Sequence, residues 1–386
     1  MKSVHLVIPD LFLPKNFAAG VSAGLRLPAL EKLLGRGQGK MSEAVSLEQL
    51  LCGSFDLPLQ DQAPIAPISA AFDGLAAGCW MRADPVNLNL QRDQLMMSAV
   101  QAGSGEAAAL SASLNEHFSG QGLEFFAPHP QRWYVRLGEL PRIRTTPLLQ
   151  ALGGDVRGVL PVGAEAARWH QLFNEVQMLL HAHPVNEARE ARGEPTINSV
   201  WFWGGGCDTL LAKPADCGNS RQAAPEVTEE DVVACSGGGC DRANGSLRSS
   251  GEPDGLPLAG ALLQKNYDSV SSDDVLAEMF ARAAGVTFSA WASLWRAGDS
   301  PGRQLLVWTG LRSALQRGDL ADWQMALQDF ESGYAQPLLA ALRSGKIAGL
   351  QLDIPGRDSL RSMRLARADI WAFWRRSGHL AGYSLV

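Results

Sequence analysis

The order in which apolar patterns follow one another is the strongest constraint on the fold of this 386-residue chain. Short apolar runs typical of central strands lie at Val4–Ile8, Trp133–Leu137, Ser199–Trp203, Gln304–Trp308 and Gly349–Asp353. Apolar residues recur at helical spacing from Trp169 to Leu180 and from Leu320 to Tyr334, where Asp319 is a candidate N-cap. Strands that alternate with helices predict an α/β fold, a mainly parallel sheet with helices on both faces. Ligand sites of such sheets lie at the carboxyl ends of the strands.

The composition excludes several classes of protein. Hydrophobic residues make up 46% of the chain, which is enough for a sizeable core and argues against wholesale disorder. The formal charge of −6 argues against a nucleic-acid partner, because proteins that bind nucleic acids need a basic surface. No run reaches the roughly 18–20 apolar residues of a membrane span, and the N-terminus lacks a signal-peptide pattern. Six Cys in a chain of this length predict free thiols and a cytoplasmic protein.

One stretch does not fit a packed core. Residues 207–255 are rich in Gly, Ser, Asp and Glu and predict a low-complexity surface loop. The loop holds four of the six cysteines: Cys207, Cys217, Cys235 and Cys240. Nine, seventeen and four residues separate successive cysteines, whereas zinc sites favour tight pairs, so exposed thiols are the preferred interpretation.

Two polar stretches are candidates for a binding site. Asn186, Arg189 and Asn198 lie between a helical pattern and a strand that ends in Gly204–Gly206, whose backbone N–H groups could approach an anion. The alternative is a helix end, a turn and a buried tryptophan strand. In Arg82-Ala-Asp84 the two charged residues face the same side of an extended segment. Either the two residues pair with each other in a structural ion pair, or Arg82 faces a ligand.

These stretches resemble a known family. The motif His183-Pro-Val-Asn186-x-x-Arg189-x-x-x-Gly193, followed by Trp203-Gly204-x-Gly206, is similar to a segment of archaeal-type, cofactor-independent phosphoglycerate mutases. Arg82-Ala-Asp84-Pro-Val resembles a second motif of these enzymes, with Asp84 in place of their Asn. The match covers about residues 78–206. It is closer still to bacterial RpfE-type regulatory proteins, which share Arg-Ala-Asp-Pro-Val and Trp-Phe-Trp-Gly-Gly-Gly.

The resemblance implies a fold and a chemistry. The mutases belong to the alkaline phosphatase superfamily, whose core carries a Ser nucleophile and two divalent metal ions held by Asp and His. We therefore expect an alkaline-phosphatase-like core at residues 1–75 and 256–386. An inserted, smaller α/β domain is expected at residues 76–206. Ser42 and Ser46 are the nearest matches to the family's nucleophile, and Arg82, Asn186, Arg189, Gly204, Gly205 and Gly206 are the expected anion contacts.

The family's metal ligands are mostly missing from this sequence. No His lies between His183 and His379, where the family has three. Asp10 follows the first strand, as the first metal ligand does, and Asp353 remains where an Asp-His pair is expected. The strand Gln304–Trp308 runs into Thr309-Gly310-Leu311-Arg312 instead of a carboxylate and a His, and Arg carries a fixed positive charge that repels metals. Two bound metals are therefore not expected, and a weak Mg²⁺ or Mn²⁺ site at Asp10 and Asp353 is the alternative.

These observations lead to a hypothesis and two alternatives. The chain is expected to be a non-catalytic or regulatory phosphoglycerate-mutase-like protein without a cofactor. Its partner would be a phosphorylated or carboxylated metabolite or a regulatory protein. The first alternative is an active metal-dependent mutase or phosphatase. The second is an interaction protein without a small ligand.

Overall fold

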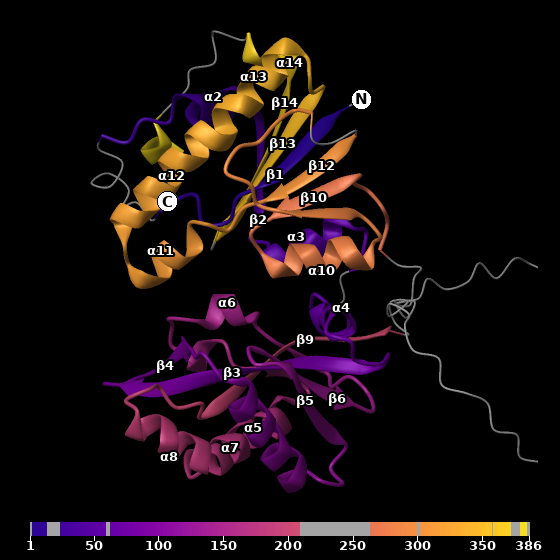
Figure 1. Cartoon of the computed structure of the whole chain (residues 1–386), viewed down its shortest axis with the longest axis vertical. Coiled ribbons are helices and arrows are strands. Elements are labelled where there is room, and N and C mark those ends of the chain that lie inside the picture. The colour runs from indigo at the N-terminus through magenta and orange to yellow at the C-terminus, as the bar shows by residue number, and fades with distance from the viewer. Residues whose placement is uncertain are drawn as a thin grey trace, which may run out of the picture.

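The computed structural model describes residues 2–13, 24–58, 62–208, 263–298, 302–356, 358–371 and 379–383. Within them the strands form a seven-stranded sheet, a five-stranded sheet and a two-stranded ribbon. Figure 1 shows the two large sheets one above the other, each with its own helices. Nearly all of the predicted loop, including Cys217, Cys235 and Cys240, lies outside the described residues.

The seven-stranded sheet has the order β11-β10-β12-β1-β13-β14-β2. Its strands are β1 (Ser3–Val7), β2 (Gln38–Glu43), β10 (Ser269–Ser272), β11 (Thr287–Ala290), β12 (Arg303–Val307), β13 (Gly349–Pro355) and β14 (Ser359–Ala366). The first five in this order run parallel, whereas β14 is antiparallel to both β13 and β2. The predicted mainly parallel sheet is confirmed.

Helices cover both faces of this sheet because successive strand residues point to opposite sides. Val7 packs in one core with α3 (Leu47–Ser54) and α10 (Val275–Ala283). Leu6 packs in a second core on the other face. That face is covered by α2 (Pro28–Arg36), α12 (Leu320–Phe330), the π-helical turn η2 (Glu331–Ala335) and α13 (Gln336–Ser344). The remaining elements of this part are α11 (Arg312–Arg317), α14 (Arg367–Ile370) and η3 (Leu380–Tyr383).

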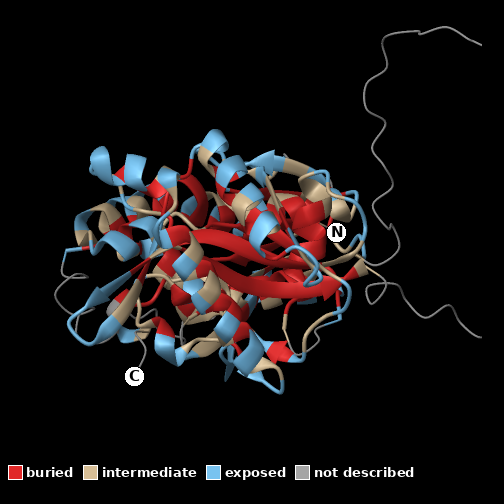
Figure 2. Cartoon of the chain, turned by 90° about the horizontal axis from the view of Figure 1, so that it is seen from below, coloured by how far each residue is buried: buried red, intermediate tan, exposed pale blue. Residues whose placement is uncertain are grey.

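The five-stranded sheet is antiparallel throughout. Its strands are β3 (Cys79–Gln91), β4 (Gln94–Ala99), β5 (Leu123–His129), β6 (Arg132–Leu137) and β9 (Ser199–Cys207), with the long β3 at its centre. The apolar runs at Trp133–Leu137 and Ser199–Trp203 are therefore strands, but they do not belong to the parallel sheet. Figure 2 shows the buried strands surrounded by more exposed helices and loops.

Helices also flank the second sheet. α5 (Ser104–His117), α7 (Ala166–His181) and α8 (Pro184–Ala191) lie on the side away from the first sheet, and α4 (Ile65–Phe72) lies between β9 and α10 (Figure 1). The smaller elements are β7 (Ile143–Arg144), α6 (Leu148–Ala151), η1 (Val156–Gly158) and β8 (Val162–Gly163). The helix predicted from Trp169 to Leu180 is α7.

The predicted helix at Leu320 begins as expected. The Asp319 carboxylate accepts hydrogen bonds from the backbone N–H of Ala321 and of Asp322, at 3.1 and 3.0 Å. Side-chain acceptors at this position satisfy the unpaired donors of the first helical turn. The α-helical geometry ends at Phe330, so Tyr334 lies in the π-helical turn instead.

The prediction of free thiols is wrong for two cysteines. Cys79, the first residue of β3, and Cys207, the last residue of β9, form a disulfide. The antiparallel register of β3 and β9 places these two residues directly opposite each other. Cys207 is therefore buried at the end of a strand and is not part of a surface loop. Cys52 is a free, buried thiol, and burial raises its pKa to about 12.

No helix among the described residues combines the length and the apolar character that a membrane crossing requires.

The contact between α4 and β9 gives a testable prediction, because the strand approaches the segment before α4 closely. A Cβ atom on Gly206 would lie 2.6 Å from Pro64 Cβ and 3.0 Å from Pro67 Cγ. We expect Gly206→Ala to lower the free energy of unfolding by about 1–3 kcal/mol, since the backbone must shift to relieve the clash. Urea denaturation followed by circular dichroism measures this change.

The matched control is Gly53→Ala on α3, where an added Cβ has no neighbour within 4 Å. Ala is favoured over Gly inside a helix by about 1 kcal/mol, so this variant should be at least as stable as the native chain. Equal stability of the two variants would contradict the close packing of β9.

Candidate functional site

Charged side chains gather where the parallel strands of the first sheet end. Asp10 follows β1, Asp273 and Asp274 follow β10, and Arg312 begins α11 shortly after β12. β1, β10 and β12 are neighbours, and their carboxyl ends lie at the same edge of the sheet. This edge is where α/β sheets usually bind ligands.

The Arg312 guanidinium lies between two of these carboxylates. Its Nε lies 3.4 Å from Asp10 Oδ2, and its Nη1 lies 3.5 Å from Asp274 Oδ2. The Arg312 side chain is 18% exposed, so water screens these pairs only in part. Asp10 has a φ of +61°, a left-handed conformation that Asp tolerates better than most residues. A fixed positive charge therefore occupies the centre of the strand edge.

Two other carboxylate oxygens of the edge accept hydrogen bonds from the protein. Asp274 Oδ1 accepts a hydrogen bond from Leu276 N at 2.7 Å and so caps α10. Asp273 Oδ1 accepts hydrogen bonds from Thr309 N and Oγ1, at 2.8 and 3.2 Å. These bonds tie the ends of β10 and β12 together and give both carboxylates a structural role.

Glu48 lies on α3 beside this edge and is the one acidic side chain of the group that is fully buried. Burial raises the pKa of the Glu48 carboxyl; the Arg312 charge opposes this shift and the Asp274 charge reinforces it. Ser46 begins the same helix through a capping box, in which Ser46 Oγ accepts from Gln49 N at 3.2 Å and Gln49 Oε1 accepts from Ser46 N at 2.9 Å. The start of α3 is therefore held by two side-chain hydrogen bonds.

A cavity of about 300 Å³ opens next to Ser46 and Glu48. Its lining includes the start of α3, the middle of β9 and the loop after β7. The polar side chains in its lining are Ser46, Glu48, Gln49, Gln62, Arg144, Thr145, Thr146 and Gln150. Gln62 Oε1 accepts hydrogen bonds from Thr145 N, at 3.2 Å, and from Thr145 Oγ1. The cavity therefore lies between the two sheets, and its charged lining residues are one exposed cation, Arg144, and one buried acid, Glu48.

The residues of the strand edge do not fit a pair of divalent metals. A two-metal site needs several Asp and His ligands that are free to bind. Here Arg312 already compensates Asp10 and Asp274, and one oxygen each of Asp273 and Asp274 accepts hydrogen bonds from the protein. Within the described ranges no group of three or more His, Cys, Asp and Glu side chains could hold a metal ion.

Asp353, the second residue of the weak metal alternative, lies inside a buried hydrogen-bond chain. His5 Nε2 lies 2.7 Å from Asp353 Oδ2, and His5 Nδ1 lies 2.7 Å from the Tyr267 hydroxyl. Gln351 Nε2 donates to the same Asp353 oxygen at 2.9 Å. The Asp353 side chain therefore supports packing between β1 and β13.

The predicted anion contacts on β3 and α8 are buried and hydrogen-bonded within the protein. Arg82 donates twice to Asp84 Oδ1, at 3.1 and 2.6 Å, which is the ion pair that the spacing predicted. Asn186 donates to the backbone oxygens of Leu180 and Ile197 and accepts from Ile197 N.

Arg189 is held in the same way, but by an acidic side chain and backbone groups. It donates to Glu106 Oε2 at 2.6 Å and to the backbone oxygens of Pro195 and Gln101. Arg82, Asn186 and Arg189 are each 6% exposed or less, and none of them lines the cavity beside Ser46. Ligand contact by these three side chains stays a prediction.

Gly204–Gly206 lies closer to the cavity than the other predicted residues. Gly204 lines it, and Gly204 N donates to Thr145 Oγ1 at 3.2 Å. An added Cβ on Gly205 would lie 3.1 Å from Gln62 Nε2, and Gly206 faces Pro64 and Pro67. The three glycines therefore allow β9 to pack closely against neighbouring side chains of the same protein.

Sequence reasoning missed Glu48, Arg144 and Gln62 as cavity residues. The capping-box spacing of Ser46 and Gln49 was the available signal for the start of α3. No spacing in the sequence relates Arg144 on β7 to Glu48 on α3, because these two elements come together only in the folded chain. Arg312 was recognised as a departure from the family, but its contacts with Asp10 and Asp274 were not predicted.

The chain has relatives among known proteins, although no protein-family model matches it. It is 26% identical over 194 residues to a 2,3-bisphosphoglycerate-independent phosphoglycerate mutase of Methanosarcina mazei, covering 47% of this chain and 48% of that protein. It is 30% identical over 150 residues to a protein titled "Probable 2,3-bisphosphoglycerate-independent phosphoglycerate mutase" of Geobacter sulfurreducens, covering 36% and 37%. The chain thus spans half or less of the length of these curated relatives. Neither is an RpfE-type protein.

A solved structure shares the fold. A protein of Pyrococcus horikoshii aligns with a TM-score of 0.52 at 12% sequence identity, over 99% of this chain and 92% of that chain. The similarity therefore extends over both sheets and beyond the segment that aligns by sequence.

The hydrogen bonds of Asp353 give a prediction for acid stability. Burial alone would raise the pKa of Asp353, but the hydrogen bond and charge of His5, with hydrogen bonds from Ser362 and Gln351, lower it below its ordinary value of 3.8. A lowered pKa in the folded state contributes stability above pH 3.8 that is lost as the pH falls through the folded-state value. We expect Asp353→Asn to cost about 1–3 kcal/mol at pH 7 and progressively less in acid.

Urea denaturation of both chains between pH 7 and pH 3 measures this difference. The exposed Asp358→Asn should track the native chain across the series. A gap between Asp353→Asn and the native chain that stays constant with pH would exclude ionised Asp353 as the source of the stability.

Proposed function

We propose that this phosphoglycerate-mutase-like chain is a non-catalytic member of its group and binds a small phosphorylated or carboxylated molecule in the cavity beside Ser46. The observation that carries the proposal is the Arg312 guanidinium, which lies 3.4 Å from Asp10 and 3.5 Å from Asp274 at the strand edge. The cytoplasmic location expected from the sequence is kept as part of the proposal.

The lack of catalysis follows from the charges at this edge. Phosphoryl transfer through a serine requires cations that stabilise the charge on the transferring group and activate the nucleophile. Ser46, a candidate for the family's nucleophile, lies at the start of α3, and its Oγ accepts a hydrogen bond from Gln49 N and caps this helix. No histidine or lysine is among the residues that line the cavity and could take its proton. Arg312 cannot do so, because a guanidinium stays protonated at any ordinary pH.

The lining of the cavity supports an acidic ligand. Arg144 supplies an exposed positive charge whose planar group can bind a carboxylate or phosphate with two hydrogen bonds. Gln49, Gln62 and Gln150 supply amide groups, and Thr145 and Thr146 supply hydroxyl groups. Burial raises the pKa of Glu48, which weakens the negative charge that would otherwise repel an anion. A volume of about 300 Å³ fits a metabolite rather than a peptide.

The first experiment tests catalysis. We expect the full chain to show no mutase or phosphatase turnover of 3-phosphoglycerate when Mn²⁺, Mg²⁺ or Co²⁺ is supplied, because Arg312 holds the carboxylates that would bind the metal. A coupled mutase assay with an active cofactor-independent enzyme as positive control measures this. Turnover that depends on added metal would overturn the proposal in favour of an active mutase.

The second experiment tests binding through Arg144. We expect 3-phosphoglycerate to bind the native chain and Arg144→Ala to weaken this binding by about 10–100-fold, since a charge-assisted hydrogen bond contributes about 1.5–3 kcal/mol. Isothermal titration calorimetry measures the affinities. Arg343→Ala, at an exposed position on α13, is the matched control and should bind like the native chain. Equal affinity in all three chains would remove Arg144 from the site.

A further inference from the structure

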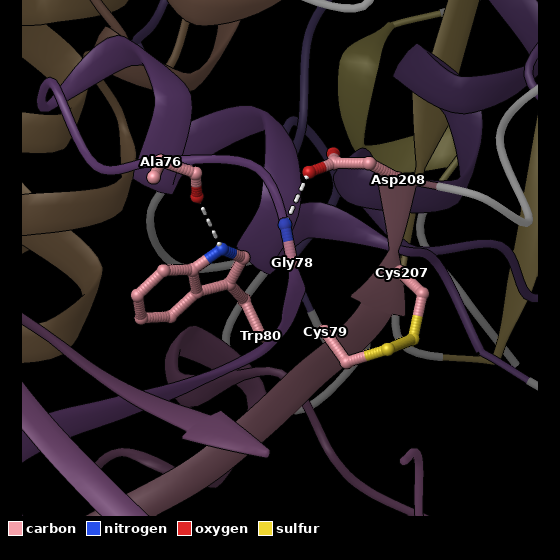
Figure 3. The surroundings of a disulfide bond; sticks show 6 residues. All are labelled: Ala76, Gly78, Cys79, Trp80, Cys207 and Asp208. Carbon is pink, nitrogen blue, oxygen red and sulfur yellow. Dashed lines mark hydrogen bonds between the residues drawn. A yellow bond between two sulfur atoms is a disulfide. The ribbon is translucent and has the colours of Figure 1, made fainter. Parts of the chain in front are cut away.

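The Cys79–Cys207 disulfide joins two strand ends at the boundary of the second sheet. Cys79 begins β3 and Cys207 ends β9, so the bond closes the whole segment from residue 79 to residue 207 (Figure 3). Asp208, the residue after Cys207, accepts a hydrogen bond from Gly78 N at 2.7 Å. The disulfide and this hydrogen bond therefore hold the same two chain ends together. None of these four residues lines the cavity beside Ser46.

The two cysteine residues differ in exposure. Cys79 is half-buried and lines an open groove of about 1080 Å³, whereas Cys207 is only 5% exposed and does not line the groove. The groove runs past the start of β5 and the end of β6. A thiol in solution can approach the Cys79 sulfur from the groove. In thiol–disulfide exchange, access largely decides which sulfur is attacked.

The groove is wide and holds charged side chains of both signs. Arg136 is exposed in the lining, and Glu124 lies opposite it on β5. Asp208 is the second acidic group, and burial raises its pKa. Gly138 is exposed and has no neighbour within 4 Å of an added Cβ, so the groove is wide at this point.

We propose that the Cys79–Cys207 disulfide is a reversible exchange site for a low-molecular-weight thiol that enters through this groove. The thiolate sulfur bonds to Cys79 Sγ, and the Sγ–Sγ bond breaks with its electron pair on Cys207 Sγ, which takes a proton from water. A second thiol molecule attacks the sulfur of the bound small thiol and releases Cys79 as a thiol. The protein disulfide is reduced, and two thiol molecules are oxidised to one disulfide.

The surrounding structure makes the exchange reversible. After reduction, the register of β3 and β9, with Trp80 opposite Gly206, and the bond from Gly78 to Asp208 still hold the two cysteines close. The disulfide can therefore form again without a large rearrangement of the chain. Disulfides of cytosolic proteins are usually transient or redox-sensing, which agrees with the location expected from the sequence. The inference does not depend on a ligand in the cavity beside Ser46.

The test uses the full chain, purified without reductant, and reduced glutathione as the probe. Peptide mapping should find Cys79 linked to Cys207 at the start and, after native incubation, a glutathione adduct on Cys79. Hydrogen exchange over residues 199–207 should rise on reduction and fall on reoxidation, with little change elsewhere. An adduct on Cys207, reaction only at the rate of global unfolding, or free thiols at both positions from the start would overturn the proposal.

Two variants separate exchange through the groove from general loss of structure. Gly138→Leu narrows the groove, so it should slow adduct formation several-fold and leave the melting temperature unchanged. The matched control is Gly105→Leu, at an open position on α5 outside the groove, which should form the adduct at the native rate. Arg136→Gln should slow the reaction with anionic glutathione more than that with neutral 2-mercaptoethanol. Unchanged rates in Gly138→Leu, with the fold intact by circular dichroism, would exclude this groove as the route.

Discussion

The carboxyl edge of the parallel sheet brings acidic groups together, and the fold has to compensate their charge. Asp10, Asp273 and Asp274 meet there because β1 and β10 are both paired to β12 and end at the same level. Carboxylates that lie near one another destabilise the fold unless a cation or hydrogen-bond donors compensate their charge. In this chain Arg312 supplies the cation and Thr309 supplies donors. A guanidinium that belongs to the chain cannot be exchanged, whereas a bound metal ion can.

The sequence predicts the parallel sheet more completely than it predicts the antiparallel sheet. The strands of the parallel sheet are short apolar runs buried on both faces, and these runs identify β1, β12 and β13 directly. The same signal identifies β6 and β9, but it says nothing about direction, because a buried strand has the same composition in parallel and antiparallel sheets. The exposed strand β2 has no apolar run and was not predicted. The disulfide was not predicted either, because it follows from the pairing of β3 with β9.

The candidate site was harder to predict because buried structural networks use the same residues as ligand sites. Arg82, Asn186 and Arg189 are polar residues in an otherwise apolar setting, a pattern that anion binding also requires. In the folded chain their donors are used by Asp84, by the backbone around Ile197 and by Glu106. Whether such a residue has a structural role or binds a ligand depends on partners up to 88 positions away in the sequence, as for Arg189 and Gln101. Spacing along the chain carries no information about such partners.

β9 connects the features that distinguish this chain. Along one strand, Trp203 donates to Asp84, Gly204 lines the cavity, Gly206 packs on Pro64, and Cys207 is bonded to Cys79. Each of these contacts limits where the neighbouring one can lie, since residues on a strand are only about 3.3 Å apart. Gly204 in the cavity lining and Cys207 in the disulfide are therefore only three residues apart on the same strand. β9 is the element of the second sheet that both lines the cavity beside Ser46 and ends at the disulfide.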